Sequence, residues 1–111
     1  MTEEYRKEIV QRLTKNLLDV QLLRLVAAQP MWGYKIKKTV ESDLGIKLRH
    51  GALYPMLNQL EKEGFLTSVR QQEGGRARKV YTLTPKGKEY IRSYYSVLRD
   101  QLKSKDRKRP S

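Results

Sequence analysis

Hydrophobic residues recur every three or four positions in the first half of the chain, a spacing typical of helices that bury one face. The first such segment predicts one long helix over residues 3–28. Pro30 ends it, because proline disfavours helical dihedral angles in the residue before it. A second segment predicts a shorter helix over residues 33–44, with Gly45 as its C-terminal stop. The apolar surface of the first helix is broad, so we expect two surfaces to cover it, one of them from another subunit.

The same periodicity predicts a third helix over residues 51–63, which Gly64 ends. The last helix begins within the string LTPKG, where Thr84 is the predicted N-cap and Pro85 the first helical residue. We expect this helix to cover residues 85–103.

Between these two helices the pattern changes to β-branched and aromatic residues, which suit a half-buried strand. Two such runs, LTSVRQ at 66–71 and KVYTLT at 79–84, lie on either side of Gly74 and Gly75. Glycine adopts the positive φ angles that tight hairpin turns need. The two runs are therefore predicted to form a β-hairpin.

Three helices followed by a two-stranded hairpin are the plan of a winged helix-turn-helix domain. The predicted fold class is mainly α with a small β-hairpin, with flanking N- and C-terminal dimerisation helices. We expect residues 1–84 to form the DNA-binding domain, residues 85–103 a C-terminal dimerisation helix, and residues 104–111 a basic flexible tail. In this plan the third helix enters the major groove of DNA. The hairpin tip, called the wing, meets the neighbouring backbone or minor groove.

The chain is strongly basic, because 24 Lys and Arg oppose 12 Asp and Glu to give a formal net charge of +12. Such a charge attracts polyanions, either nucleic acid or an anionic membrane surface. No segment approaches the about 20 consecutive apolar residues of a membrane span, and no export signal is expected. The absence of cysteine fits a cytoplasmic protein, which is the predicted location.

Residues that carry catalysis or bind metals are scarce. The chain has one histidine, His50, no cysteine and no glycine-rich phosphate loop. A lone histidine cannot complete a metal site. We therefore expect no enzyme activity, no metal and no cofactor.

Positive charge is concentrated around the predicted turn, in the string RQQEGGRARKVY. The glycines let the backbone approach a duplex closely, while guanidinium groups bind phosphate or enter a narrow minor groove. Strand alternation points Arg76 and Arg78 to the same face. The alternative is a solvated hairpin with a charged tip. The predicted DNA-binding residues of the wing are Arg70, Gly74, Gly75, Arg76, Arg78 and Lys79.

Three strings, WGYKIKK, GALYPMLNQLEKEGFL and EGGRARKVYTLTPKGKEY, occur in this order and closely resemble the PadR family of transcriptional regulators. The resemblance covers about residues 13–92, and the single C-terminal helix resembles the family's small subgroup. It implies a sequence-specific regulator of transcription that binds double-stranded DNA, a homodimeric repressor in many cases relieved by a small molecule.

The resemblance also places Tyr54 and Pro55 at the start of the recognition helix. Tyr54 is then directed at the DNA, and the alternative is a partly buried aromatic. Pro55 lacks an amide hydrogen, which a helix tolerates only in or near its first turn. Asn58 lies one turn beyond Tyr54, where its amide either pairs with an adenine edge or faces solvent.

Further basic residues around this helix are candidate DNA contacts. Arg49 and His50 immediately precede the helix, whose N-terminus favours an anion. The family commonly has a small residue near His50, which leaves that contact open. Lys35 and Lys38 on the second helix bind the DNA backbone or face solvent.

The two terminal helices carry more apolar surface than a core of this size can hide. We expect the last helix to pack on the partner's first helix, and the alternative is that its residues close the protomer's own core. The predicted dimerisation residues are Val10, Leu13, Leu17, Tyr90, Ile91, Tyr94, Leu98 and Leu102. A symmetric pair predicts a pseudo-palindromic operator with half-sites about 10–10.5 base pairs apart. Trp32 is expected to pack against the core. The sequence indicates no particular small-molecule effector, so an effector of unknown identity and the absence of any effector both stay open.

Three rival functions fit the sequence less well. A MarR-like or other winged-helix nucleic-acid-binding protein without an effector is the nearest, but it needs longer flanking helices. RNA binding is disfavoured because most tyrosines lie in predicted helices and not on a strand platform for stacking bases. Membrane-surface binding is disfavoured because no helix combines a basic face with bulky apolar anchors.

Overall fold

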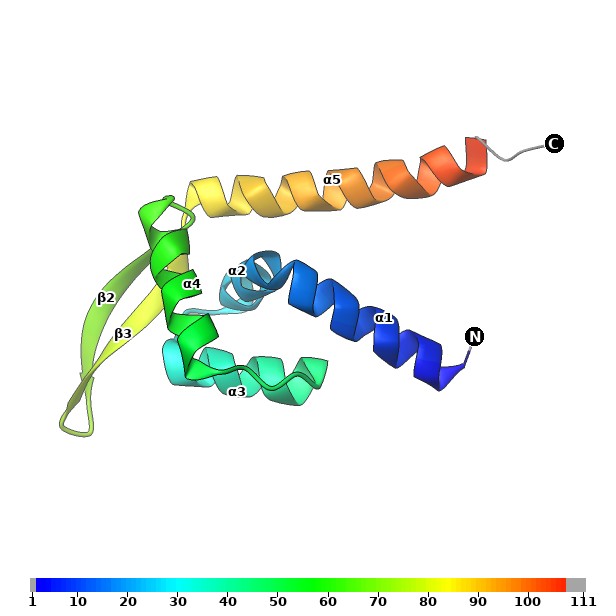
Figure 1. The fold of residues 1–111 in the computed structure, drawn as a ribbon. Helices are drawn as coiled ribbons and strands as arrows, with labels where there is room; N and C mark the ends of the chain where they lie inside the picture. The colour runs from blue at the N-terminus through cyan, green and yellow to red at the C-terminus, as the bar shows by residue number, and fades with distance from the viewer. Residues whose placement is uncertain (1, 108–111) are drawn as a thin grey trace.

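The computed structural model describes residues 2–107, without the side chains of His50, Glu73 and residues 104–107. The chain folds into five helices and three strands over the described residues, as Figure 1 shows. The elements are α1 (Glu3–Asn16), α2 (Leu18–Ala28), β1 (Met31–Trp32), α3 (Gly33–Leu44), α4 (His50–Lys62), β2 (Leu66–Glu73), β3 (Arg76–Leu83) and α5 (Pro85–Arg107). This confirms a mainly helical fold with a small β-hairpin.

The prediction of one long helix over residues 3–28 is wrong, because the helix breaks at Leu17. Leu17 has φ −121° and ψ 39°, outside the helical range, and separates α1 from α2. Two side chains compete with the backbone for hydrogen bonds there. The Thr14 hydroxyl donates to the Val10 carbonyl at 2.8 Å, a bond that bends helices. The Asp19 carboxylate accepts the Val20 N–H at 2.8 Å.

Helices α3 and α4 form the helix-turn-helix unit. Gly45 ends α3 in the left-handed conformation with φ 66°, as its position in the sequence predicts. The connection between the helices is fastened by Ile46 and Leu48, which are both buried.

Pro55 lies deeper in α4 than the sequence predicts, because the helix begins at His50 and contains the proline in its second turn. The missing N–H of Pro55 leaves the Gly51 carbonyl without its intrahelical partner. Gly51 and Pro55 are both exposed, so this carbonyl lies on the solvent side of the helix.

The hairpin prediction is confirmed, and a third strand joins it. Strands β2 and β3 pair in register from Leu66 opposite Leu83 to Glu73 opposite Arg76. Gly74 and Gly75 make the turn with φ angles of 56° and 79°. The two-residue strand β1 pairs with the inner part of β3, so the strand order is β1-β3-β2.

The core lies between α2, α3, α4 and the inner half of the sheet. Its completely buried side chains share an aliphatic character and come from separate elements: Leu22, Leu23, Ile36, Val40, Leu53 and Leu57. Tyr81 of β3 and Ile91 of α5 close this core. Every buried side-chain nitrogen or oxygen in the described part of the chain has a hydrogen-bond partner.

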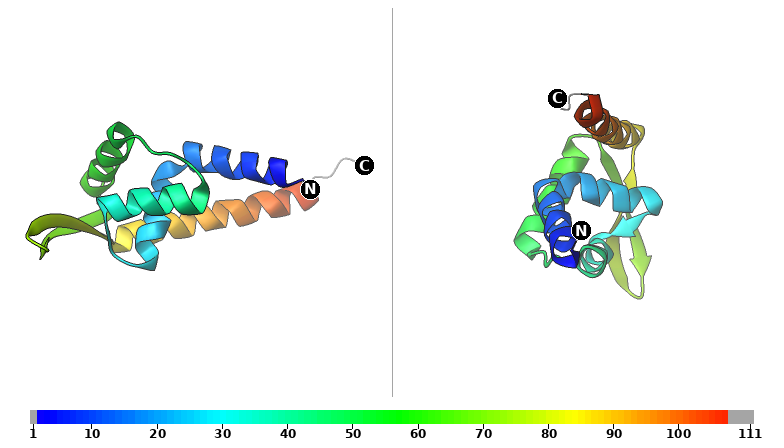
Figure 2. Two further views of the ribbon diagram at one scale, coloured as in Figure 1. Left: turned by 90° about the horizontal axis from the view of Figure 1, so that it is seen from below. Right: turned by 90° about the vertical axis from the view of Figure 1, so that its right-hand side faces the viewer.

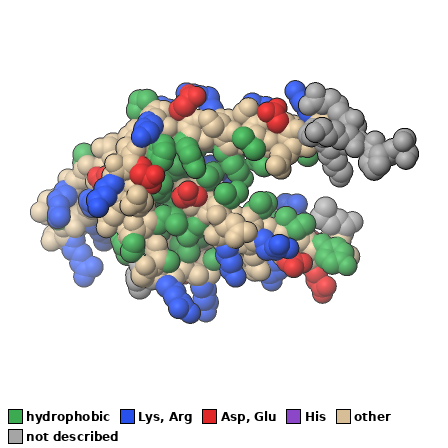
Figure 3. All heavy atoms as spheres, turned by 45° about the horizontal axis from the view of Figure 1, so that its top comes forward, with side chains coloured by type: hydrophobic (Ala, Val, Ile, Leu, Met, Phe, Trp, Pro, Cys, Tyr) green, Lys and Arg blue, Asp and Glu red, His purple; other side chains and the backbone are tan. Residues whose placement is uncertain are grey.

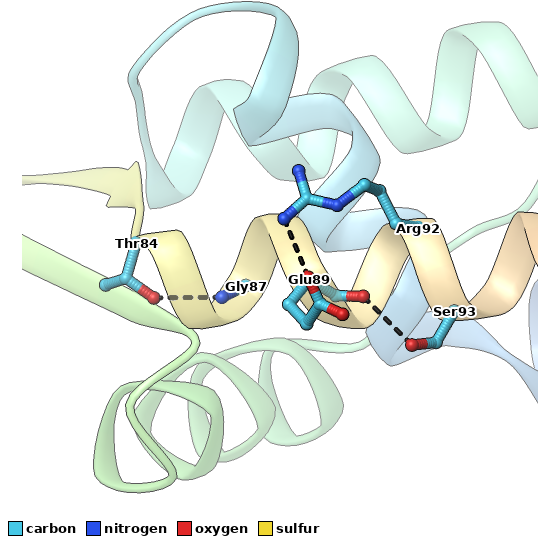
Figure 4. A network of polar contacts seen from close by, with 5 residues as sticks. All are labelled: Thr84, Gly87, Glu89, Arg92 and Ser93. Carbon is cyan, nitrogen blue, oxygen red and sulfur yellow. Dashed lines mark hydrogen bonds and ion pairs between the residues drawn. The ribbon is translucent and has the colours of Figure 1, made fainter.

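The start of α5 is fastened to the end of α4. The Thr84 hydroxyl accepts the Gly87 N–H at 3.0 Å (Figure 4), which confirms Thr84 as the N-cap. The same hydroxyl donates to the Gly64 carbonyl at 2.6 Å. Lys86 donates to the Glu63 carbonyl at 2.6 Å. Gly87 is packed so closely that an added Cβ would lie 2.4 Å from the Phe65 carbonyl oxygen. These contacts fix the direction in which α5 leaves the domain.

The predicted boundary between the last helix and a flexible tail after residue 103 is wrong for four residues. Helix α5 continues to Arg107, because Lys and Arg are good helix formers and no proline or glycine interrupts them. Residues 108–111 of the predicted tail lie outside the described residues.

The molecule is elongated, with principal extents of 65 × 32 × 21 Å. Helices α1 and α5 project from the domain as two arms, while the β2–β3 hairpin extends from the opposite end (Figures 1 and 2). A hydrogen bond of 2.9 Å from the Arg24 guanidinium to the Tyr95 hydroxyl ties α5 to α2. None of the described helices is long and apolar enough to span a bilayer.

Candidate nucleic-acid interface

The outward face of α4 carries the polar and aromatic residues that the sequence singles out. Tyr54 is 39% exposed, and Asn58 is exposed one turn later. The Tyr54 ring lies against the backbone of Gly33, where an added Cβ would be 2.7 Å from the ring. The Tyr54 ring can therefore pack directly against the backbone at the start of α3 because Gly33 has no side chain.

A groove of about 300 Å³ separates α4 from the hairpin. Tyr54 and Asn58 line it from α4, and Arg78, Lys79 and Tyr81 line it from β3. Burial raises the pKa of the Tyr81 hydroxyl, so this phenol stays protonated at neutral pH. The groove thus joins the exposed face of α4 to the cationic strand.

The outer part of the hairpin presents cations to solvent. Arg70 on β2 and Arg76 on β3 are exposed, and the glycine turn between them is exposed as well. The register places Arg76 and Arg78 on one face of the ribbon, as the sequence predicts, and Lys79 and Arg70 on the other. The hairpin therefore offers positive charge on both faces.

Arg78 and Lys79 are less available than the sequence indicates. Arg78 is half-buried, and its guanidinium carbon lies 3.7 Å from the centre of the Trp32 ring. Lys79 forms an ion pair with Glu61 of α4 at 3.1 Å. Part of the general attraction predicted for Lys79 is therefore neutralised within the protein.

Glu61 is held by two elements of the sheet. Its carboxylate accepts the Ser68 hydroxyl at 2.6 Å and the Lys79 ammonium at 3.1 Å. The hydrogen bond from Ser68, followed by the Lys79 charge, lowers the pKa of Glu61 below its usual value. This ionised side chain ties α4 to the base of the hairpin.

The basic residues on α3 and before α4 surround this face. Lys35 and Lys38 are exposed on α3, and the Lys38 ammonium lies 5.4 Å from the centre of the Tyr34 ring. Arg49 is exposed at the N-cap of α4, while the side chain of His50 lies outside the described residues. Figure 3 shows Lys and Arg side chains gathered over the hairpin end of the molecule. Among the described residues no three His, Cys, Asp or Glu side chains could hold a metal ion.

A second surface lies between the two arms. An apolar groove of about 440 Å³ separates α1 and α2 from α5, and Figure 3 shows hydrophobic side chains lining the hollow. Five of the predicted dimerisation residues line this groove: Leu13, Leu17, Tyr90, Tyr94 and Leu98. Val10 is half-buried on α1 and is not part of the lining, and Leu102 lies further along α5, 68% exposed.

The prediction that Ile91 takes part in dimerisation is wrong. Ile91 is only 8% exposed and belongs to the protomer's own core. The helical repeat alone could not separate it from Tyr90, which is 40% exposed.

The Transcriptional regulator PadR-like family matches residues 22–93, from α2 to the first half of α5. This chain belongs to the PadR-like family. The resemblance read from the three sequence strings is therefore confirmed.

Two curated relatives are similar over part of their length. The transcriptional regulator Rv3488 of Mycobacterium tuberculosis is 46% identical over 44 residues, which are 40% of this chain and 41% of that protein. The negative transcriptional regulator PadR of Bacillus subtilis is 31% identical over 82 residues, which are 71% of this chain and 45% of that protein. The chain thus spans less than half the length of the curated relatives it matches.

Solved structures share the fold. The crystal structure of Bacillus subtilis PadR in complex with operator DNA is 30% identical with a TM-score of 0.67, over 71% of this chain and 46% of that one. A PadR-like transcription factor from Bacteroides fragilis is 20% identical with a TM-score of 0.76, over 90% of this chain and 97% of that one. The second likeness shows the fold alone, a winged helix with flanking helices.

Sequence reasoning missed three residues of this interface. Gly33 seats Tyr54, Glu61 binds Lys79, and Trp32 stacks against Arg78. Trp32 was expected only to pack on the core, yet it lies half-buried at the groove. The strand β1 that positions Trp32 has two residues, too few for a pattern of alternation to reveal.

Proposed function

We propose that this protein is a sequence-specific regulator of transcription that binds double-stranded DNA through α4 and the β2–β3 hairpin. The observation that carries the proposal is the pairing of an exposed helix face with an adjacent cationic ribbon. Tyr54 and Asn58 are the residues of α4 that meet base edges or backbone, and Arg76 is the tip cation of the wing.

The remaining basic side chains supply sequence-independent attraction. Arg49, Arg70, Lys35 and Lys38 are exposed around the groove, where they contact phosphates. Gly74 and Gly75 let the turn approach the duplex because they carry no side chain. His50 stays a predicted contact whose side chain lies outside the described residues.

The likeness to a PadR structure that was solved with operator DNA supports this function. Residues 22–93, which carry the family match, include α3, α4 and the whole hairpin. Since the protein belongs to a family of transcriptional regulators, we expect it to act without catalysis. The MarR-like alternative is disfavoured, because the family match names a different group.

The proposal includes a homodimer that represses transcription. Leu13 and Val97 are 44% and 56% exposed on facing sides of the apolar groove between the arms. A second copy of the chain covers such a surface by laying its own arm there, as a symmetric contact requires. Two copies then read a pseudo-palindromic operator with half-sites about one helical turn apart. A cytoplasmic location and an effector of unknown identity stay predictions.

Selection of bound duplexes from a random library, repeated at two salt concentrations, tests this function. We expect enrichment of an inverted repeat and an affinity that falls steeply with salt, with a slope that counts the neutralised phosphates. Enrichment of no sequence at either salt concentration would contradict specific recognition. Enrichment of a single, non-repeated site would contradict the dimer.

A further inference from the structure

We propose that Trp32 is a positioning residue for DNA binding, because it holds Arg78 and thereby fixes the angle of the wing against α4. This inference rests on the proposed function and deepens it. It concerns how the hairpin is aimed and not which residue touches DNA.

The pairing of β1 with β3 brings these two side chains together. Trp32 lies opposite Val80, and Arg78 is two residues further out on the same face of β3. Diagonal neighbours of this kind are within reach of aromatic and long side chains. The Arg78 guanidinium carbon is 3.7 Å from the centre of the indole ring, a distance at which the two planar groups are in contact.

Two consecutive residues of β3 hold the wing in place, one on each face of the ribbon. Arg78 stacks on Trp32 on one face, and Lys79 binds Glu61 of α4 on the other. Beyond these residues the ribbon is exposed: Arg70, Gln71 and Gln72 on β2, and Arg76 and Ala77 on β3. A two-stranded ribbon is marginal on its own in water, so contacts at its base decide where the tip lies.

Trp32 is itself fixed by the start of α3. Its ring stacks with Tyr34, with ring centres 5.4 Å apart and planes inclined by 24°. The Tyr54 ring of α4 packs against the backbone of Gly33, the residue between them. The segment 32–34 therefore contacts both the recognition helix and the wing, and it sets the width of the groove between them.

The test separates stacking from charge. Arg78→Lys keeps the positive charge and loses the flat guanidinium, so stacking on the indole is lost. We expect about threefold to fivefold weaker binding to the selected duplex with an unchanged thermal midpoint. The matched control is Arg12→Lys, the same change at an exposed position on α1 outside the interface and without an aromatic contact among the described residues, which should bind like the parent.

Two further variants distinguish positioning from a direct contact. If Arg78 acts by aiming the tip, Arg76→Ala should weaken binding less in the Arg78→Lys background than in the parent. Trp32→Phe keeps an aromatic face and should retain most of the affinity, while Trp32→Leu should reproduce Arg78→Lys. Full additivity of the Arg76 and Arg78 effects would overturn the positioning role.

Trp32 is the single tryptophan of the chain, so its fluorescence reports on the stack without DNA. We expect Arg78→Lys to change the emission and Arg12→Lys to leave it unchanged. Unchanged emission and affinity in Arg78→Lys would overturn the inference. If the parent protein binds no duplex, the proposed function is overturned, and with it the role of the stack in DNA binding. A changed emission of Arg78→Lys would still show in that case that Trp32 and Arg78 are in contact.

Discussion

At the hairpin end of the molecule most exposed side chains are cationic or polar, whereas each of the two arms also exposes several large apolar side chains. Arg70 and Arg76 face solvent on the ribbon, while Val97 and Leu102 of α5 are 56% and 68% exposed. A cationic ribbon is well solvated by itself. Exposed apolar side chains on an arm are unfavourable in water, so burying them against another surface lowers the free energy. We propose that the two ends bind different partners, a polyanion and a second copy of the chain.

The two ends also differ in how firmly they are held. The hairpin base is held by the Glu61–Lys79 ion pair and the Trp32–Arg78 stack. The described contacts of α5 with the rest of the domain lie in its first turns and at the Arg24–Tyr95 hydrogen bond. The joint at Thr84–Gly87 connects the two ends, so it fixes the direction of the α5 arm relative to the hairpin.

The difference between the two ends is tested most directly by a polar substitution on the apolar arm. Leu98→Lys places a charge in the groove between the arms, and in the proposed dimer each copy loses a leucine that the partner covers. We expect the dimer to weaken by at least about 2 kcal/mol of association free energy. Sedimentation at micromolar concentration measures this, with Ser96→Lys as a control at an exposed position outside the groove. A parent that sediments as a monomer would contradict the role assigned to the arms.

The joint between the ends is tested by Gly87→Ala. An added Cβ would lie 2.4 Å from the Phe65 carbonyl oxygen and 2.5 Å from a Leu83 methyl carbon. We expect overpacking to cost about 2 kcal/mol, which lowers the thermal midpoint by roughly 10 °C in a domain of this size. Gly51→Ala is the control, because an added Cβ there meets nothing within 4 Å. Equal midpoints for the two variants would show that the joint is not tightly packed.

The cationic end is tested without disturbing the fold by Arg76→Ala. The side chain is exposed at the tip, so the thermal midpoint should stay nearly unchanged. Loss of one phosphate contact should weaken binding to all duplexes and reduce the salt slope by about one. Lys7→Ala removes an equal charge from α1 and should leave the slope unchanged. An affinity equal to that of the parent would contradict the assignment of the wing.

The smallest effect is expected for Glu61→Gln, which sharpens the account of the hairpin base. The folded-state pKa of Glu61 lies below its ordinary value of 4.5, so its ionisation stabilises the fold above that pH. This stability is lost as the pH falls through the folded-state pKa. The variant should be less stable than the parent at pH 7, by about 1 kcal/mol or less, and the difference should shrink in acid.

Thermal unfolding of both proteins between pH 7 and pH 3 measures this difference. Glu89→Gln serves as the control, because the Glu89–Arg92 ion pair is exposed on α5 and contributes little (Figure 4). A difference between Glu61→Gln and the parent that does not change with pH would contradict the role of the ionised carboxylate.

Local patterns predicted the elements whose signals are contained in a few neighbouring residues. Helices α3 and α4 follow from their apolar spacing, and the hairpin follows from Gly74 and Gly75, because period and turn chemistry are both local properties. The break at Leu17 gave no such signal. It needs no proline or glycine and leaves the apolar repeat on either side nearly unchanged.

The contacts that position the interface are not local, and this is why the sequence could not reveal them. Trp32 and Arg78 come together only because β1 pairs with β3, and Glu61 meets Lys79 only because α4 packs beside the sheet. The exposed cations Arg70 and Arg76 were easier to predict, since they depend on no distant partner. Which of Ile91 and Tyr90 is buried likewise depends on how α5 packs on the core.

The most direct measurement of the central claim is a titration of a selected duplex with the protein at physiological salt, with a scrambled duplex of equal length and base composition as competitor. The account predicts two chains bound per selected duplex and a preference of about 10³-fold or more over the scrambled one. Equal affinity for the two duplexes, or saturation by one chain, would contradict it.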